Sequence, residues 1–281
     1  MSSASNNQEH YVMEGVEGEL QRLADQHAVL KHAMGALTVA PVDFSRPNLR
    51  ILDSGTADGL WLRELQESLG DRDGTHEYIG TDIASAFFPK QVAPAFVFCN
   101  QSITQDWPQA WEHSFDYVHQ RLTLAGAAQT PVIDCVTRLV QLVKPGGWIE
   151  LVEADFTGPS TNGPAMKQFE TMMRQFLTAV GVGFEYARPL KAYLQGAELR
   201  NVHERIFNIS YGAACKDAQI ATKSVSHLVT ASKGLWEFTH AQASVTPNRG
   251  ELEDFQNAIQ KELEAQGAHF KMVAVWSQTS L

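Results

Sequence analysis

The sequence lacks the features that mark several large classes of protein. Its three cysteines, Cys99, Cys135 and Cys215, form no C-x-x-C pair, which argues against a disulfide framework or a zinc site and is typical of a reducing compartment. Positive charge is scarce: the formal net charge is −10. Nucleic acid and anionic membrane surfaces are therefore poor candidates for the main partner, because both require a basic patch.

Long apolar runs are also missing. No window reaches the length that a transmembrane helix needs, and the first ten residues, MSSASNNQEH, lack the apolar core of a signal peptide. We therefore expect a cytoplasmic protein with neither a membrane partner nor a bound metal. The length of 281 residues predicts one large domain rather than two independent folds.

Short apolar runs alternate with helical patterns over the first half of the chain. Such alternation predicts an α/β protein with a parallel sheet. Further along, helical patterns dominate, and two more alternating runs at 202–211 and 269–277 predict late strands. The earlier expected strands cover 49–52, 77–82, 96–99, 115–119 and 148–153.

The stretch 49–61, LRILDSGTADGLW, has the strongest local pattern. It predicts a buried strand, a tight glycine turn and the start of a helix, an arrangement that lets a ligand approach the backbone at the mouth of a parallel sheet. The turn departs from the G-x-G-x-x-G pattern of dinucleotide sites, because Asp53 and Ser54 come first and Ala57 replaces a glycine. An ordinary strand-to-helix turn is the alternative interpretation.

Polar residues follow other expected strands. Asp82 ends the second strand, where an acid suits hydrogen bonding to ribose hydroxyls; capping of a following helix is the alternative. The fourth strand runs through His119 into Gln120 and Arg121. Side chains at the carboxyl end of a central strand face the crevice where ligands bind in open α/β sheets.

Taken together, these segments resemble class I S-adenosylmethionine-dependent methyltransferases. The resemblance is carried by LDSGTADGLW, IGTD, FDYVHQR and LVKPGGWIELVE. The R-L-x-x-Q-H pattern at 22–27 and V-H-x-R at 118–121 are similar to the fungal secondary-metabolism branch with LaeA-like proteins. The resemblance implies an α/β, Rossmann-like, seven-stranded mostly parallel sheet with helices on both faces and helical lid insertions.

The resemblance also implies a domain organisation. We expect a flexible N-terminal arm at 1–17 and one methyltransferase domain at 18–281, with lid segments at about 159–200 and 215–247. The helix expected at 164–180 is rich in methionine and phenylalanine, which are usually core residues but also suit a lid over an apolar substrate. An apolar small molecule is therefore the expected substrate.

The cofactor that the resemblance implies is S-adenosylmethionine. The glycine turn would line its methionine part, Asp82 would bind its ribose, and the segments after the second and third strands would meet its adenine. Gln120 would lie near the sulfonium, and the first helix would close over the carboxylate. Two departures are Ala57 and Ser102, which stand where a glycine and an acid are common. The implied cofactor-binding residues are Arg22, Gln26, Asp53, Gly55, Thr56, Asp82, Ile83, Ser102, Ile103 and Gln120.

Methyl transfer is a direct displacement that mainly requires alignment in a water-poor pocket. The candidate general base is His119, with Tyr11 and His27 as weaker candidates; a hydrogen-bonded structural role for His119 is the alternative. The resemblance extends to fungal enzymes that S-methylate the reduced dithiols of epidithiodiketopiperazines such as gliotoxin. A thiol acceptor has little need of a strong base.

Three other functions stay open from the sequence. The first is O- or N-methylation of another fungal metabolite. The second is a protein that binds S-adenosylmethionine without transferring its methyl group, as a regulator or a pericyclase. The third is a nicotinamide-dependent oxidoreductase, which the imperfect glycine pattern of residues 53–59 disfavours.

Overall fold

The computed structural model describes residues 11, 13, 15, 17–197, 199, 201–242 and 248–280. It contains a seven-stranded sheet of order β3-β2-β1-β4-β5-β7-β6, in which β7 runs antiparallel to both of its neighbours and the other pairs are parallel. The predicted mostly parallel α/β fold is therefore confirmed. The strands are β1 (Arg50–Ser54), β2 (Glu77–Asp82), β3 (Phe96–Asn100), β4 (Phe115–Arg121), β5 (Val143–Asp155), β6 (His203–Tyr211) and β7 (Ala268–Gln278).

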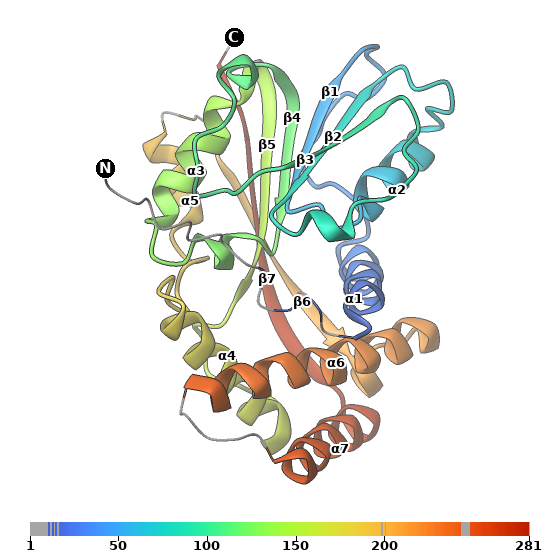
Figure 1. Cartoon of the computed structure of the whole chain (residues 1–281), viewed down its shortest axis with the longest axis vertical. Coiled ribbons are helices and arrows are strands. Elements are labelled where there is room, and N and C mark those ends of the chain that lie inside the picture. Colours follow the sequence, from blue (N-terminus) through green and yellow to red (C-terminus); the bar gives the residue numbers. More distant parts are fainter. Residues whose placement is uncertain are drawn as a thin grey trace, which may run out of the picture.

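Helices cover both faces of the sheet. In Figure 1, α2 lies on one side of the strands and α3 and α5 lie on the other. Helices α4, α6 and α7 contact one another beyond the carboxyl ends of the parallel strands (Figure 1). The helices are α1 (Glu19–Met34), α2 (Leu60–Leu69), α3 (Val132–Gln141), α4 (Pro164–Ala179), α5 (Leu190–Gly196), α6 (Ala218–Gln242) and α7 (Arg249–Ala265).

The central strands are buried on both faces, which explains their continuous apolar runs. Successive side chains of a strand point to opposite faces. In β1, Leu52 therefore packs in the core beneath α3 and α5, whereas Ile51 packs with Trp61 of α2. The alternation thus separates two apolar layers, one on each face of the sheet.

Strand β5 begins earlier than the sequence pattern predicts. The sequence pattern predicts a strand from residue 148, after the K-P-G-G segment, but β5 already starts at Val143. The pairing with β4 shifts register between Phe115 and Tyr117, and Gly146 has a φ of 75°. The proline and glycines therefore form an irregularity inside the strand rather than a boundary, as bulges do.

The predicted lid segments pack in two different cores: α5 lies in the core that it shares with α3, whereas α4 and α6 lie in a second one. Buried side chains from α1, α4, α6 and α7 pack with those of β6 and β7 in one apolar cluster, which includes Leu30, Met166, Leu228, Ile259 and Met272. Helix α6 lies along α1. The division into an arm at 1–17 and a domain at 18–281 stays a prediction, and residues 1–10, 12, 14 and 16 of the arm lie outside the described residues.

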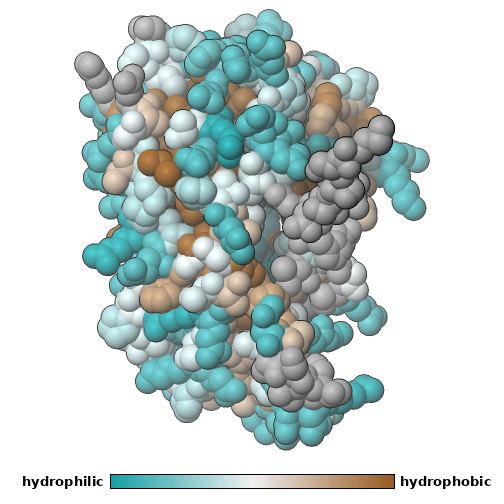
Figure 2. Space-filling model, turned by 60° about the vertical axis from the view of Figure 1, so that its left-hand side comes forward, coloured by the Kyte–Doolittle hydropathy of each residue, from teal (hydrophilic) through white to brown (hydrophobic). Residues whose placement is uncertain are grey.

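Figure 2 shows one face of the molecule, on which hydrophilic residues predominate and hydrophobic residues form smaller patches between them. Within the part of the chain that the structure describes, no helix is both long and apolar enough to cross a bilayer.

Candidate active site

The glycine turn follows β1 and is fixed to β2. The backbone N–H groups of Gly55 and Thr56 both donate to the carbonyl oxygen of Thr81, at 2.7 and 2.9 Å. Gly55 has a φ of 75°, and a Cβ atom placed on it would lie 2.0 Å from Thr123 Oγ1. A side chain at this position would therefore clash as well as strain the backbone. Ala57, in place of a glycine, also adopts a left-handed φ of 50°, which costs about 1 kcal/mol or more for an L-residue.

Asp82 joins the end of β2 to this turn. Its Oδ2 accepts the backbone N–H of Ala57 at 2.8 Å, and its Oδ1 accepts that of Ala84 at 2.9 Å. Burial raises the pKa of Asp82, while these backbone hydrogen bonds act in the opposite direction. The acid expected to bind ribose therefore lies against the glycine turn, and it also closes the local turn that leads to Ala84.

The residues predicted to meet adenine surround the exits of β2 and β3. The carbonyl oxygen of Ile83 accepts a hydrogen bond from Asn100 Nδ2 at 2.8 Å. Ser102 Oγ accepts the backbone N–H of Thr104 at 3.1 Å. Ile103 is buried and belongs to the apolar core beneath α3. Contacts of these residues with adenine stay predictions.

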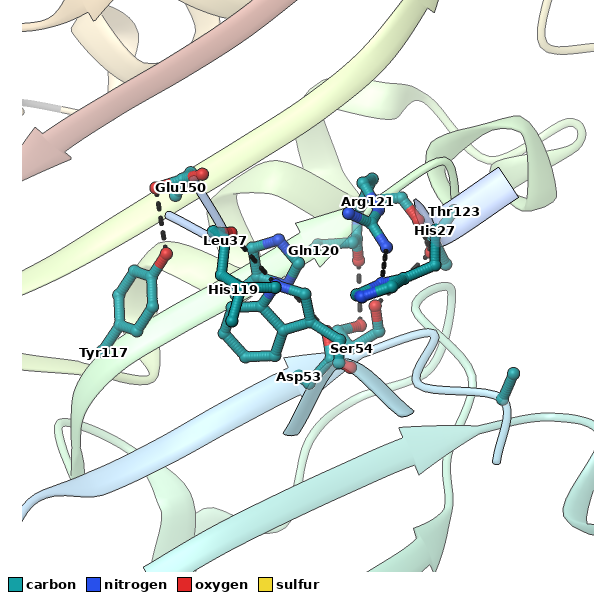
Figure 3. A network of polar contacts seen from close by, with 12 residues as sticks. His27, Leu37, Asp53, Ser54, Tyr117, His119, Gln120, Arg121, Thr123 and Glu150 are labelled. Carbon is teal, nitrogen blue, oxygen red and sulfur yellow. Dashed lines mark hydrogen bonds and ion pairs between the residues drawn. The ribbon is translucent and has the colours of Figure 1, made fainter. Parts of the chain in front are cut away.

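His119 and Asp53 form a buried pair between β4 and β1. His119 Nδ1 lies 2.7 Å from Asp53 Oδ1 (Figure 3). The imidazole stacks on Trp61, with the ring centroids 3.8 Å apart and the planes 2° from parallel. His119 is 1% exposed and Asp53 is 3% exposed. These contacts favour the structural role for His119 over that of a general base.

Gln120 points to the opposite face of β4. Its Oε1 accepts a hydrogen bond from Ser54 Oγ at 2.9 Å (Figure 3). Its Nε2 is buried and has no partner among the described residues, and the same is true of the hydroxyl groups of Thr56 and Thr81. An unpaired buried polar group costs free energy. Unpaired polar atoms thus gather where β1, β2 and β4 end, as a site for a polar ligand requires.

The two cofactor-binding residues predicted on α1, Arg22 and Gln26, differ in their contacts. Arg22 donates to both carboxylate oxygens of Glu19, at 2.6 and 2.7 Å, and its Nη1 lies 3.3 Å from His227 Nδ1 of α6. Gln26 is half-buried, and its side chain makes no hydrogen bond among the described residues. The Glu19 carboxylate therefore neutralises the charge of Arg22, and the contact with His227 links α1 to α6. The predicted contact of Arg22 with a cofactor carboxylate stays a prediction.

The two weaker candidate bases, Tyr11 and His27, are both tied into contacts of α1, and a catalytic role for either stays a prediction. The Tyr11 hydroxyl donates to Glu19 at 2.7 Å, and burial raises the pKa of Tyr11 above its ordinary value. Burial and the nearby Arg121 charge lower the pKa of His27 to about 4. Both groups hold α1 in place through their contacts.

Two acids of β5 were missed as organisers of this region. Glu150 Oε2 accepts the backbone N–H groups of Val39 and Ala40, at 2.9 and 2.8 Å, and the Tyr117 hydroxyl at 2.9 Å. Glu153 Oε1 accepts the backbone N–H groups of Thr123 and Leu124 in the loop after β4. A signal was available: an acid inside an otherwise apolar strand must find hydrogen-bond partners when the strand is buried.

The described residues contain no group of three or more His, Cys, Asp or Glu side chains arranged to hold a metal ion. A family profile described as a methyltransferase domain matches residues 10–204. The chain belongs to this methyltransferase family. The predicted membership of a methyltransferase family is therefore confirmed, while the roles of individual residues stay predictions.

Relatives along the whole chain agree with this assignment. The methyltransferase is 34% identical over 273 residues to the N-methyltransferase sirN of Leptosphaeria maculans, covering 96% of this chain and 94% of the relative. It is 28% identical over 290 residues to the N-methyltransferase gliN of Aspergillus fumigatus, covering 99% of both chains.

A solved structure supports the fold. In the complex between the Haloferax volcanii Trm112 methyltransferase activator and the putative methyltransferase, the matched chain is 14% identical to this one. The match has a TM-score of 0.53 and covers 99% of this methyltransferase and 100% of that chain. The expected Rossmann-like methyltransferase fold is thus confirmed.

Proposed function

We propose that this methyltransferase transfers the methyl group of S-adenosylmethionine to a nitrogen atom of an apolar small molecule of fungal secondary metabolism. The observation that carries the cofactor assignment is the contact between Asp82 and the glycine turn, with Oδ2 2.8 Å from the Ala57 nitrogen. This contact brings a carboxylate and a close-approach backbone together at the carboxyl ends of two adjacent parallel strands, where open α/β sheets bind ligands.

The polar residues of this edge suit the parts of the cofactor. Asp82 would accept hydrogen bonds from ribose hydroxyls, and the backbone at Gly55 would approach the methionine part. The unpaired Nε2 of Gln120 and hydroxyl of Thr56 supply polar groups at the same edge. When bound, the cofactor supplies an electrophilic methyl group on a sulfonium. A structure solved with S-adenosylhomocysteine, of a Haemonchus contortus N-methyltransferase, has the same fold with a TM-score of 0.51.

Nitrogen is the preferred acceptor because the relatives sirN and gliN are both named N-methyltransferases. An amine nitrogen attacks with its lone pair and can lose its proton to water after the methyl group has been transferred, so the chain needs mainly to align it and exclude water. The ring nitrogen of a diketopiperazine is an amide, whose lone pair is delocalised into the carbonyl group, so its proton must pass to water or a base as the methyl group arrives. A His119 side chain held by Asp53 and Trp61 therefore agrees better with an amine acceptor. The predicted thiol acceptor is the competing proposal.

Two matched acceptors separate nitrogen from sulfur. One is a reduced dithiodiketopiperazine whose thiols are blocked by S-methylation and whose ring nitrogens carry hydrogen. The other has free thiols and methylated ring nitrogens. Each is incubated with purified protein and S-adenosylmethionine, and the products are measured by mass spectrometry, with an apolar secondary amine and a phenol included as further acceptors.

We expect a mass gain of one methyl group on the amine or on the thiol-blocked acceptor, together with S-adenosylhomocysteine. Methylation of the free thiols alone would establish the S-methylation hypothesis instead. Cofactor binding without S-adenosylhomocysteine from any acceptor would contradict the proposal and favour a non-methylating protein. Asp82→Asn serves as the site variant, because it removes the charge at the predicted ribose contact and keeps the side-chain shape.

A further inference from the structure

We propose that Glu153 is a positioning residue that links the lid segment to the cofactor turn through Tyr186 and Thr123. The proposal rests on the proposed function, since it assigns the glycine turn to S-adenosylmethionine. Glu153 lies on β5, and Tyr186 lies between α4 and α5, inside the lid segment predicted at about 159–200, where its ring is buried in the core beneath α3 and α5. Thr123 follows β4.

The Glu153 carboxylate is fully used by these contacts. Its Oε1 accepts the backbone N–H groups of Thr123 and Leu124, both at 2.9 Å. Its Oε2 accepts the hydroxyl hydrogen of Tyr186 at 3.0 Å. The side chain is buried with 0% exposure, so water does not compete for these hydrogen bonds. One carboxylate thus holds a loop with one oxygen and the lid segment with the other.

Thr123 carries the link on to the glycine turn. Its hydroxyl lies 3.0 Å from the carbonyl oxygen of Arg121 and 3.4 Å from that of Ser54 (Figure 3). A Cβ atom on Gly55 would lie 2.0 Å from the same hydroxyl oxygen. Thr123 therefore occupies the space beside the turn, and a shift of the loop changes the packing of Gly55.

The loop at 122–128 has a backbone conformation that contacts from outside the loop must stabilise. Leu122 has a φ of 55° and Ala128 has a φ of 50°, which are left-handed conformations at residues other than glycine. Such conformations persist where surrounding contacts impose them. The two hydrogen bonds from the loop backbone to Glu153 lie between these two positions and supply that constraint.

Three variants and a matched control test the link. Glu153→Ala removes all three hydrogen bonds, Glu153→Gln keeps an oxygen acceptor for the loop amides, and Tyr186→Phe removes only the lid contact. The control is Tyr78→Phe, which removes another buried Tyr hydroxyl that donates to a carboxylate, Asp71 at 2.9 Å. Tyr78 lies near the start of β2, at the opposite end of the sheet from the turn.

Affinity for S-adenosylmethionine is measured by calorimetry, and kcat and KM are measured for the acceptor. We expect Glu153→Ala to weaken cofactor affinity at least tenfold and Glu153→Gln to restore it to within about threefold of wild type. Tyr186→Phe should weaken cofactor affinity at least threefold and raise the acceptor KM more than it lowers kcat. Tyr78→Phe should change neither constant. Glu153 and Tyr186 variants that fold, lose thermal stability and keep wild-type affinity and kinetics would overturn the link.

A second measurement separates this proposal from the proposed function. If wild-type protein binds no S-adenosylmethionine, the proposed function fails. Amide hydrogen exchange over residues 52–60 then tests whether Tyr186 and Glu153 constrain the glycine turn. Faster amide exchange of the turn in Tyr186→Phe than in Tyr78→Phe would support the link. Equal exchange in the two variants would overturn it.

Discussion

His27 of α1 accepts a hydrogen bond from Arg121 at the end of β4, with 2.8 Å between His27 Nδ1 and Arg121 Nη2 (Figure 3). Arginine only donates, so Nδ1 is unprotonated and Nε2 carries the hydrogen of the neutral ring. Nε2 lies 3.0 Å from Glu64 Oε2 but outside hydrogen-bond geometry, and Lys31 Nζ lies 2.6 Å from the same oxygen. The R-L-x-x-Q-H and V-H-x-R segments are therefore in direct contact.

This contact predicts acid sensitivity. Burial and the Arg121 charge lower the pKa of His27 from 6.5 to about 4, so between these values the unfolded chain binds more protons than the folded one. The stabilisation is complete above pH 6.5 and is lost as the pH falls towards 4, by about 3 kcal/mol at 1.36 kcal/mol per pKa unit. Urea unfolding of wild type and His27→Gln at pH 7.5 and 4.5 measures it. Equal losses in the two proteins would contradict the assignment.

The titration of Glu153 should make the free energy of unfolding fall as the pH rises, the opposite of the effect expected for His27. Burial raises its pKa from 4.5 to about 7, so the folded state binds more protons than the unfolded state within this window. The contribution to stability is fully present below pH 4.5 and is lost as the pH rises through 7, by up to about 3 kcal/mol. The stability of Glu153→Gln relative to wild type should therefore increase from pH 4.5 to 7.5. A constant difference over this range would show that Glu153 does not titrate there.

Asp82 is expected to determine cofactor affinity. Hydrogen bonds to a charged group contribute about 1.5–3 kcal/mol each, so Asp82→Asn should weaken binding of S-adenosylmethionine by roughly one to two orders of magnitude in calorimetry. Asp71→Asn is the control, because Asp71 is a buried, hydrogen-bonded acid in the turn before β2. Unchanged affinity in a folded Asp82→Asn protein would refute the ribose assignment.

Alanine substitutions at Gly55 and Gly70 separate the cost of a steric clash from the cost of backbone strain. Both have positive φ, 75° and 66°, but a Cβ atom on Gly70 meets nothing within 4 Å, whereas one on Gly55 meets Thr123. Gly70→Ala should cost about 1–2 kcal/mol from strain alone. Gly55→Ala should cost more in thermal unfolding and should also reduce cofactor affinity. Equal stability losses in the two variants would show that Thr123 does not constrain the turn.

His119→Gln separates the two roles considered for this residue. Loss of the Asp53 contact and of stacking on Trp61 should destabilise the protein by about 2 kcal/mol, as expected when a buried polar group loses its hydrogen-bond partner. Methyl transfer by the folded fraction should stay within tenfold of wild type, with an unchanged pH profile. A loss of a thousandfold or more, with one limb of the pH profile removed, would identify His119 as the general base.

Much of the fold was predictable because its signals are local. The strand at 77–82 has the predicted bounds, and α4 and β6 begin and end within one residue of the predicted ranges. The turn at Gly55 was also predictable, since strand, glycine and helix signals follow each other directly. The start of β5 was not predictable. A proline-glycine segment usually indicates the end of a helix or strand, and only the irregular pairing with β4 shows that the strand continues through it.

The sequence by itself determined the alternating α/β order, the glycine turn and the acid at the end of β2, because each depends on the spacing of a few neighbouring residues. The tertiary structure decided which buried polar groups became partners. Glu153 meets Tyr186, and His27 meets Arg121, across long stretches of chain. A buried polar group must be paired, but its residue type does not specify its partner. That choice follows from which side chains the completed sheet and its helices bring within hydrogen-bond distance.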